Sequence, residues 1–125
     1  MAGTVVVPWY ATGFRADAFE VALNELAATA LRYGASSYSV YRARDDRYKF
    51  QQMAGFEEYI DWERYWEGEE MTYFRARYSS WYQVPVLYGW WDLTAHGAIE
   101  RGGAGPVTSG TNGLGGNGAG VGESA

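Results

Sequence analysis

Few side chains in this sequence could do acid–base chemistry near neutral pH. It contains no cysteine and a single histidine, His96. The lack of cysteine excludes disulfides, thiol nucleophiles and cysteine-based metal centres, and one histidine excludes a multi-histidine site within one chain. His96 follows the last apolar stretch, where an imidazole could act as the catalytic base at a cavity rim or a subunit edge. The competing interpretation is a solvated histidine in a connecting segment.

Aromatic and polar side chains suggest a different kind of site, one that binds a flat molecule. Rings stack on a planar ligand, and tyrosine hydroxyls orient it. The candidate substrate-binding residues are Tyr41, Gln52, Trp62, Trp66, Tyr88 and Trp90. Gln52 and Arg42 are polar residues within expected strands, so burial would make them indications of a polar ligand group. Core packing or exposure at a sheet edge explains the same residues without a ligand.

Three acids, Glu67, Glu69 and Glu70, surround Gly68. Carboxylates so arranged at the start of a helix complement its macrodipole, which explains them better than a metal site or an acid–base pair does. We therefore predict no metal site and no cofactor.

Composition favours one compact domain. The chain has 125 residues, of which 47% are hydrophobic, and thirteen of its 22 aromatic residues lie between positions 56 and 91, so this stretch must supply much of the core. The net charge of −5 without a basic run lacks the electrostatic footprint of a nucleic-acid-binding protein. No apolar run approaches the ~18–20 residues of a membrane span, and the start lacks signal-peptide features. We expect a cytoplasmic protein without a membrane span.

Hydrophobic periodicity predicts six elements that position these residues. They are a strand over 4–10, a helix over 16–33 that ends at Gly34, strands over 37–43 and 48–53, a helix over 56–78 that is bent near Gly68, and a strand over 83–94. Phe56, Tyr59, Trp62 and Trp66 are expected on one helical face. Pro8 cannot donate a ladder hydrogen bond, which predicts a bulge or an unpaired position there.

The end of the chain has a different composition. Ten of the 24 residues in 102–125 are glycine and Glu123 is the only charge. Such a segment cannot bury enough surface to offset its ordering entropy, so we expect a flexible tail after a domain over 1–101. As a coil it would span ~25–30 Å, enough to contact a neighbouring subunit or a partner protein.

The order strand, helix, strand, strand, helix, strand predicts an α+β fold, the ferredoxin-like βαββαβ arrangement with a four-stranded antiparallel sheet and helices on one face. The first and last strands carry apolar residues on both faces. Because a monomer rarely exposes a large apolar patch, a second sheet should cover the bare face, which predicts a homodimer or a higher homo-oligomer.

This element order resembles that of the antibiotic-biosynthesis-monooxygenase-like domains of the dimeric α+β barrel superfamily. The resemblance covers roughly 4–95 and rests also on the runs YKFQQMAGFEEYIDWERYW and WYQVPVLYGWWDL. It implies two subunits that pair sheet to sheet into a closed barrel, with a ligand cavity between sheet and helices in each. The family includes cofactor-independent oxygenases and haem-degrading enzymes. The latter use a helical histidine, which neither expected helix contains.

Two functions stay open at this point. The resemblance implies a small-molecule-binding protein, and one interpretation is a monooxygenase that needs no cofactor and acts on a flat phenolic or quinol-like substrate. The alternative is a non-catalytic binding or assembly subunit that uses the dimer as a scaffold and the glycine-rich tail as a tether. The sequence does not decide whether the protein is an enzyme.

Overall fold

The computed structural model describes residues 2–100, and the predicted tail over 102–125 lies outside them. Residues up to Asp92 form one compact unit. Leu93 to Glu100 follow without a helix or strand. None of the helices in the described part of the chain is long and apolar enough to cross a membrane.

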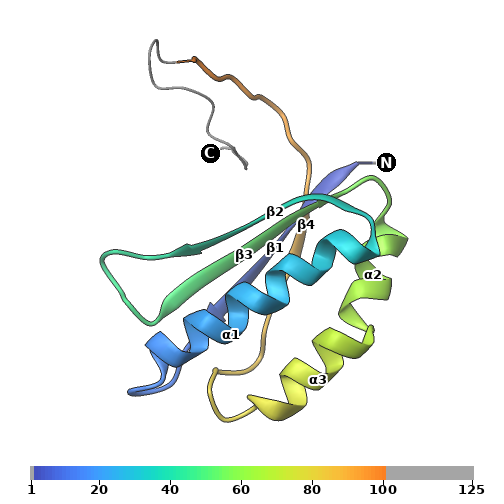
Figure 1. The fold of residues 1–125 in the computed structure, drawn as a ribbon. Helices are drawn as coiled ribbons and strands as arrows, with labels where there is room; N and C mark the ends of the chain where they lie inside the picture. Colours follow the sequence, from blue (N-terminus) through green and yellow to red (C-terminus); the bar gives the residue numbers. More distant parts are fainter. Residues whose placement is uncertain (1, 101–125) are drawn as a thin grey trace. The chain divides into compact units, whose positions relative to one another are not determined.

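The compact unit has the ferredoxin-like fold that the sequence predicts (Figure 1). Its sheet has the strand order β2-β3-β1-β4, all neighbours are antiparallel, and the helices lie over one face. The strands are β1 (Gly3–Tyr10), β2 (Ala35–Arg42), β3 (Lys49–Phe56) and β4 (Gly89–Trp91). The helices are α1 (Ala16–Ala28), the 3₁₀-helix η1 (Thr29–Tyr33), α2 (Tyr59–Trp66) and α3 (Glu69–Arg77).

β1 is the central strand that the core is built on. Its side chains alternate, so Val5, Val7 and Trp9 are buried under the helices, while Val6 and Pro8 point to the opposite face. The strand stays in register with β3 through Pro8, so the predicted bulge is absent. β4 pairs with β1 only from Thr4 to Val6, and Pro8 therefore lies beyond the end of that neighbour, where a missing N–H on that side is tolerated.

The first helix forms as predicted but changes type near its end. α1 buries Phe19, Leu23 and Leu26, and the chain continues as the 3₁₀-helix η1. Gly34 then adopts the left-handed conformation with φ 98°, which an L side chain disfavours. The predicted C-terminal glycine is confirmed.

Two expectations about the aromatic stretch were wrong in detail. Phe56 ends β3, because its strand pairing with β1 and β2 continues to that residue, and α2 starts only at Tyr59. The buried face of α2 consists of Trp62 and Tyr65, whereas Tyr59 is 37% exposed. The break at Gly68 between α2 and α3 is as predicted.

The last strand is much shorter than the predicted run over 83–94. Only Gly89–Trp91 pairs as a strand, and an isolated bridge joins Tyr82 to Ala11. Between them the chain is irregular, and Val84 and Leu87 are exposed. Pro85 explains part of this difference, since it has no N–H to donate to a ladder. The apolar side chains in this segment were mistaken for a strand with two covered faces.

Candidate functional site

Gln52 lies at the centre of a buried polar network between the sheet and the helices. Its Oε1 accepts a hydrogen bond from Trp9 Nε1 at 3.0 Å, and its Nε2 donates to the Tyr65 hydroxyl at 3.3 Å. That hydroxyl donates to the backbone oxygen of Leu26 at 2.7 Å. Burial raises the pKa of Tyr65, so it stays a neutral donor. The network therefore joins β1, β3, α1 and α2. Both polar atoms of the Gln52 side chain form hydrogen bonds in it.

A second cluster lies where α2 faces the chain leading into β4. The Trp62 and Trp66 rings are 5.4 Å apart, and the Tyr88 ring lies 4.9 Å from Trp62 and 5.0 Å from Trp66. Arg75 of α3 joins them, with its guanidinium carbon 4.2 Å from the centre of the Trp66 ring. We call these four residues the Trp66 cluster. Such rings and a cation at this distance attract one another.

Two hydrogen-bond donors of this cluster have no acceptor in the described part of the chain. Among the described residues, the buried side-chain nitrogens without a hydrogen bond are Trp62 Nε1 and Arg75 Nε. Each is an N–H group, and each belongs to a side chain packed on the Trp66 ring. A buried donor without an acceptor costs free energy, and such exceptions call for an explanation such as an unseen water or a ligand. Both atoms would be satisfied by an acceptor oxygen.

In the part of the chain that the structure describes, no carboxylate forms an ion pair with Arg75. Its Nη2 donates a hydrogen bond to the backbone oxygen of Trp66 at 2.6 Å. Its charge also reaches Tyr82, whose pKa burial raises and Arg75 partly lowers. A cation that is packed on an aromatic ring and not paired with an acid favours a nearby negative charge.

Tyr59 and Trp90 extend the cluster toward the surface. Their rings are 5.1 Å apart and nearly perpendicular. Burial raises the pKa of Tyr59, and a hydrogen bond with the Tyr88 hydroxyl raises it further. The hydroxyls of Tyr59 and Tyr88 therefore lie together at the outer end of the cluster, where they could orient a polar group.

The structure brings some of the predicted site residues together and separates others. Trp62, Trp66, Tyr88 and Trp90 gather around α2. Gln52 lies beneath them in the core, bonded within the protein. Tyr41 pairs with Gln51, whose side chain points to the face of the sheet opposite the core, and it is 50% exposed. Tyr41 therefore cannot line one space with Trp62.

Arg42 lies apart from the cluster, and His96 belongs to the segment that follows the compact unit. His96 is exposed in the segment after Asp92 that has neither helix nor strand. Arg42 Nη1 pairs with Asp17 at 2.9 Å and with Glu20 at 2.7 Å, so this guanidinium joins β2 to α1. Within residues 2–100, no group of three or more histidines, cysteines or carboxylates could hold a metal ion.

Sequence reasoning missed Arg75 and Tyr65. Arg75 lies in the last turn of α3, where its charge suits the macrodipole, and its contact with Trp66 depends on the direction that α3 takes after Gly68. No local spacing shows that contact. Tyr65 was overlooked because Tyr59 and Trp66 already formed a helical stripe; its position three residues after Trp62 was the available signal.

Known structures resemble this chain in fold more than in sequence. No protein-family model matches the sequence, and no curated protein matches it. Among solved structures, PA3566 from Pseudomonas aeruginosa has a TM-score of 0.66 at 21% identity, covering 74% of this chain and 95% of that one. A variant of SnoaB, a cofactor-independent oxygenase from Streptomyces nogalater, has a TM-score of 0.64 at 16% identity, covering 75% and 94%.

A structure described as an antibiotic biosynthesis monooxygenase has a TM-score of 0.66 at 11% identity, and covers 76% of this chain and 100% of that one. Identities this low show the fold and leave substrate and activity open. The resemblance drawn from the sequence is thus confirmed at the level of the fold: this chain is similar in fold to structures described as a cofactor-independent oxygenase and an antibiotic biosynthesis monooxygenase.

Proposed function

We propose that the protein binds a small flat phenolic or quinol-like molecule at the Trp66 cluster and oxidises it with O2, without a metal or an organic cofactor. The observation that carries this proposal is the pair of buried donors beside the same indole ring, Trp62 Nε1 and Arg75 Nε, for which residues 2–100 offer no acceptor. The similarity in fold to a cofactor-independent oxygenase supports it.

Each residue of the cluster has a role in this proposal. The flat faces of Trp66 and Tyr88 hold the substrate ring by stacking. Trp62 Nε1 and the Arg75 guanidinium donate hydrogen bonds to the substrate oxygen, and the positive charge favours its deprotonated form. A phenolate is a much better electron donor than a phenol, so this stabilisation makes the substrate reactive toward O2.

The chemistry balances without a further reductant. In a phenol, a ring C–H para to the hydroxyl becomes a carbonyl, so that one phenol and one O2 give one quinone and one water. In a quinol, a ring C–H becomes C–OH while both hydroxyls become carbonyls, so that one quinol and one O2 give one hydroxyquinone and one water. The substrate supplies the four electrons that reduce O2. One oxygen atom stays in the product, and the other leaves as water with two hydrogen atoms of the substrate.

The substrate would enter where the chain before β4 now covers the cluster. Residues 83–88 have no regular structure, and Val84 and Leu87 are exposed, so few backbone bonds hold this segment in place. A shift of the Tyr88 side chain would open the face of Trp66. Lid segments of this kind commonly gate access to buried sites.

Oxygen consumption with a panel of quinols, combined with tryptophan fluorescence, tests the proposal. Arg75→Gln and Trp62→Phe should each lower kcat/KM about tenfold or more, the scale expected for losing a hydrogen bond to a charged group. Arg77→Gln is the matched control, since Arg77 is exposed on the same helix. No oxygen uptake and no fluorescence change with any quinol would contradict the proposal.

The packing of the core favours a second candidate. Rings fill much of the space between sheet and helices, with Trp9 5.5 Å from Phe74 and 5.0 Å from Tyr82. We propose as the alternative a non-catalytic binding or assembly subunit. Its tether would be residues 102–125, which lie outside the described residues. A set of co-purifying partners that shrinks when 102–125 are deleted, together with no turnover of quinols, would favour this alternative.

In either case we propose a homodimer that pairs through the bare face of the sheet. Apolar side chains gather on the side of the sheet that carries no helix. They are Val6, Pro8, Tyr41, Met53 and Trp91. Trp91 is 60% exposed there. An exposed apolar surface of this kind marks a contact site, and a second copy offers the same surface in return.

A further inference from the structure

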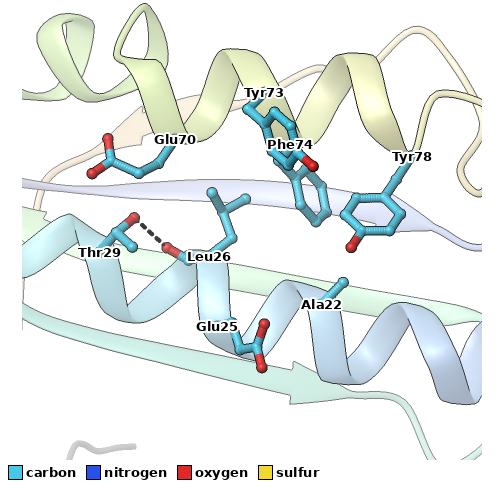
Figure 2. A pocket seen from close by; sticks show the side chains of 8 residues that line it. All are labelled: Ala22, Glu25, Leu26, Thr29, Glu70, Tyr73, Phe74 and Tyr78. Carbon is cyan, nitrogen blue, oxygen red and sulfur yellow. Dashed lines mark hydrogen bonds between the residues drawn. The ribbon is translucent and has the colours of Figure 1, made fainter.

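A groove between α1 and α3 lies on the helical side of the fold, away from the bare sheet face. Figure 2 shows Ala22, Glu25, Leu26 and Thr29 on one wall and Glu70, Tyr73, Phe74 and Tyr78 on the other. Its volume is about 200 Å³. Since sheet-to-sheet pairing leaves this side open, the groove is accessible in a monomer and in the proposed dimer.

The floor of the groove is apolar and its rim is aromatic. Leu26 and Phe74 are buried at the base, while Tyr73 is 63% exposed at the edge. The Tyr78 ring packs on Phe74 with centres 5.1 Å apart, and it points from α3 toward α1. Aromatic faces carry partial negative charge and attract cations.

Two carboxylates complete the lining, and they differ in their partners. Glu70 accepts a hydrogen bond from Tyr33 at 2.5 Å and pairs with Arg32 at 3.2 Å. Glu25 is exposed and has no ion pair or side-chain hydrogen bond within residues 2–100. Glu25 is therefore the carboxylate of the groove that is available to a ligand, and aromatic side chains line the same groove.

We propose that this groove binds a small organic ammonium ion, with its charged nitrogen at Glu25 and its apolar body against Leu26, Phe74 and Tyr73. The site is independent of the Trp66 cluster. A protonated amine with a short apolar group meets both features of the groove, since its hydrophobic part fits the floor and its cation suits the carboxylate and the rings. A carboxylate ligand would be repelled by Glu25 and Glu70.

Titration of the ¹⁵N-labelled full chain with benzylammonium at neutral pH tests the proposal. Benzyl alcohol serves as a neutral ligand of similar shape, and benzoate as an anionic one. We expect saturable amide shifts in 22–29 and 70–78 with benzylammonium, weaker binding of the alcohol and no saturation with benzoate. Equal affinity for the three ligands, or shifts confined to other residues, would overturn the proposal.

Variants then separate the carboxylate from a general effect of charge. Glu25→Gln should weaken benzylammonium binding about two- to fivefold, the range for an exposed ion pair, and leave the alcohol unaffected. Glu57→Gln, which removes an exposed acid outside the groove, is the matched control and should bind as the unchanged protein does. Glu25 is exposed, so its variant is expected to fold; unchanged binding by it would contradict the assignment.

Discussion

Gln52 shows how a buried polar residue can stabilise the fold through hydrogen bonds within the protein. Its side chain accepts from Trp9 and donates to Tyr65, so Gln52→Leu would leave the Trp9 N–H buried without an acceptor. We expect this change to lower the free energy of unfolding by about 1–3 kcal/mol. Urea unfolding at one fixed protein concentration measures it, because an oligomer's stability depends on concentration.

Asn24→Leu provides the control for that experiment. Asn24 lies in α1 and is exposed, away from the sheet face that we propose to pair. Its replacement should change stability by less than about 0.5 kcal/mol. If the two variants unfolded at the same urea concentration, the polar network would not contribute as the geometry indicates.

At the scale of elements, Gly68 fixes the angle at which α3 follows α2. A Cβ at this position would overlap the Tyr33 hydroxyl and lie 2.9 Å from the backbone oxygen of Arg64. Gly68→Ala should therefore destabilise the protein by about 1–3 kcal/mol, as for an overpacked site. Gly13→Ala is the comparison, since a Cβ there meets nothing within 4 Å. Thermal unfolding should show a lower Tm for the first variant alone.

The hydrogen bond between Tyr33 of η1 and Glu70 of α3 should make the stability of the folded protein depend on pH. The Tyr33 hydroxyl donates to Glu70, and with help from Arg32 it holds the pKa of that carboxyl below its usual value. The folded state thus binds the proton less tightly than the unfolded state. The stabilisation is complete above the usual pKa of about 4.5 and is lost as the pH falls through the lower folded-state value.

The variant Tyr33→Phe, compared with the unchanged protein, measures this pH-dependent stabilisation. The unchanged protein should be more stable than the variant by no more than about 1 kcal/mol at pH 7, because the pair is partly exposed. That difference should shrink between about pH 5 and pH 3. For Tyr38→Phe, which alters an exposed tyrosine of β2, the difference should be independent of pH. A constant difference for Tyr33→Phe would show that the contact acts only through packing.

Elements could be predicted from the sequence where one local pattern decided them. The stripe of Phe19, Leu23 and Leu26 and the glycine at position 34 define α1 and its end without help from the rest of the chain. The segment before β4 could not be predicted, because Tyr88 packs on α2 from an irregular backbone while Val84 and Leu87 are exposed. Arg75 reaches Trp66 only through tertiary structure. For this reason the unpaired Arg75 Nε beside that ring, within the described residues, could not be predicted from the sequence.

At the scale of the whole molecule, the two faces of the sheet differ in what covers their apolar side chains. One face is covered by the helices of the same chain, and the residues beneath them, such as Val5 and Trp9, are buried. The other face carries Val6, Met53 and Trp91 with no element of the compact unit over them. Burial of that face by a second copy would remove apolar surface from water on both subunits at once.

Val6→Glu tests this pairing directly. Val6 points away from the core, so a glutamate there can be solvated in a monomer, but in a sheet-to-sheet dimer it would lose its water beside the same residue of a second copy. We expect the unchanged protein to sediment as a dimer at micromolar concentration and Val6→Glu as a folded monomer, with the fold checked by circular dichroism. Val21→Glu, on the exposed side of α1, should remain dimeric. A monomeric unchanged protein would refute sheet-to-sheet pairing, and a dimeric Val6→Glu would move the interface to another surface.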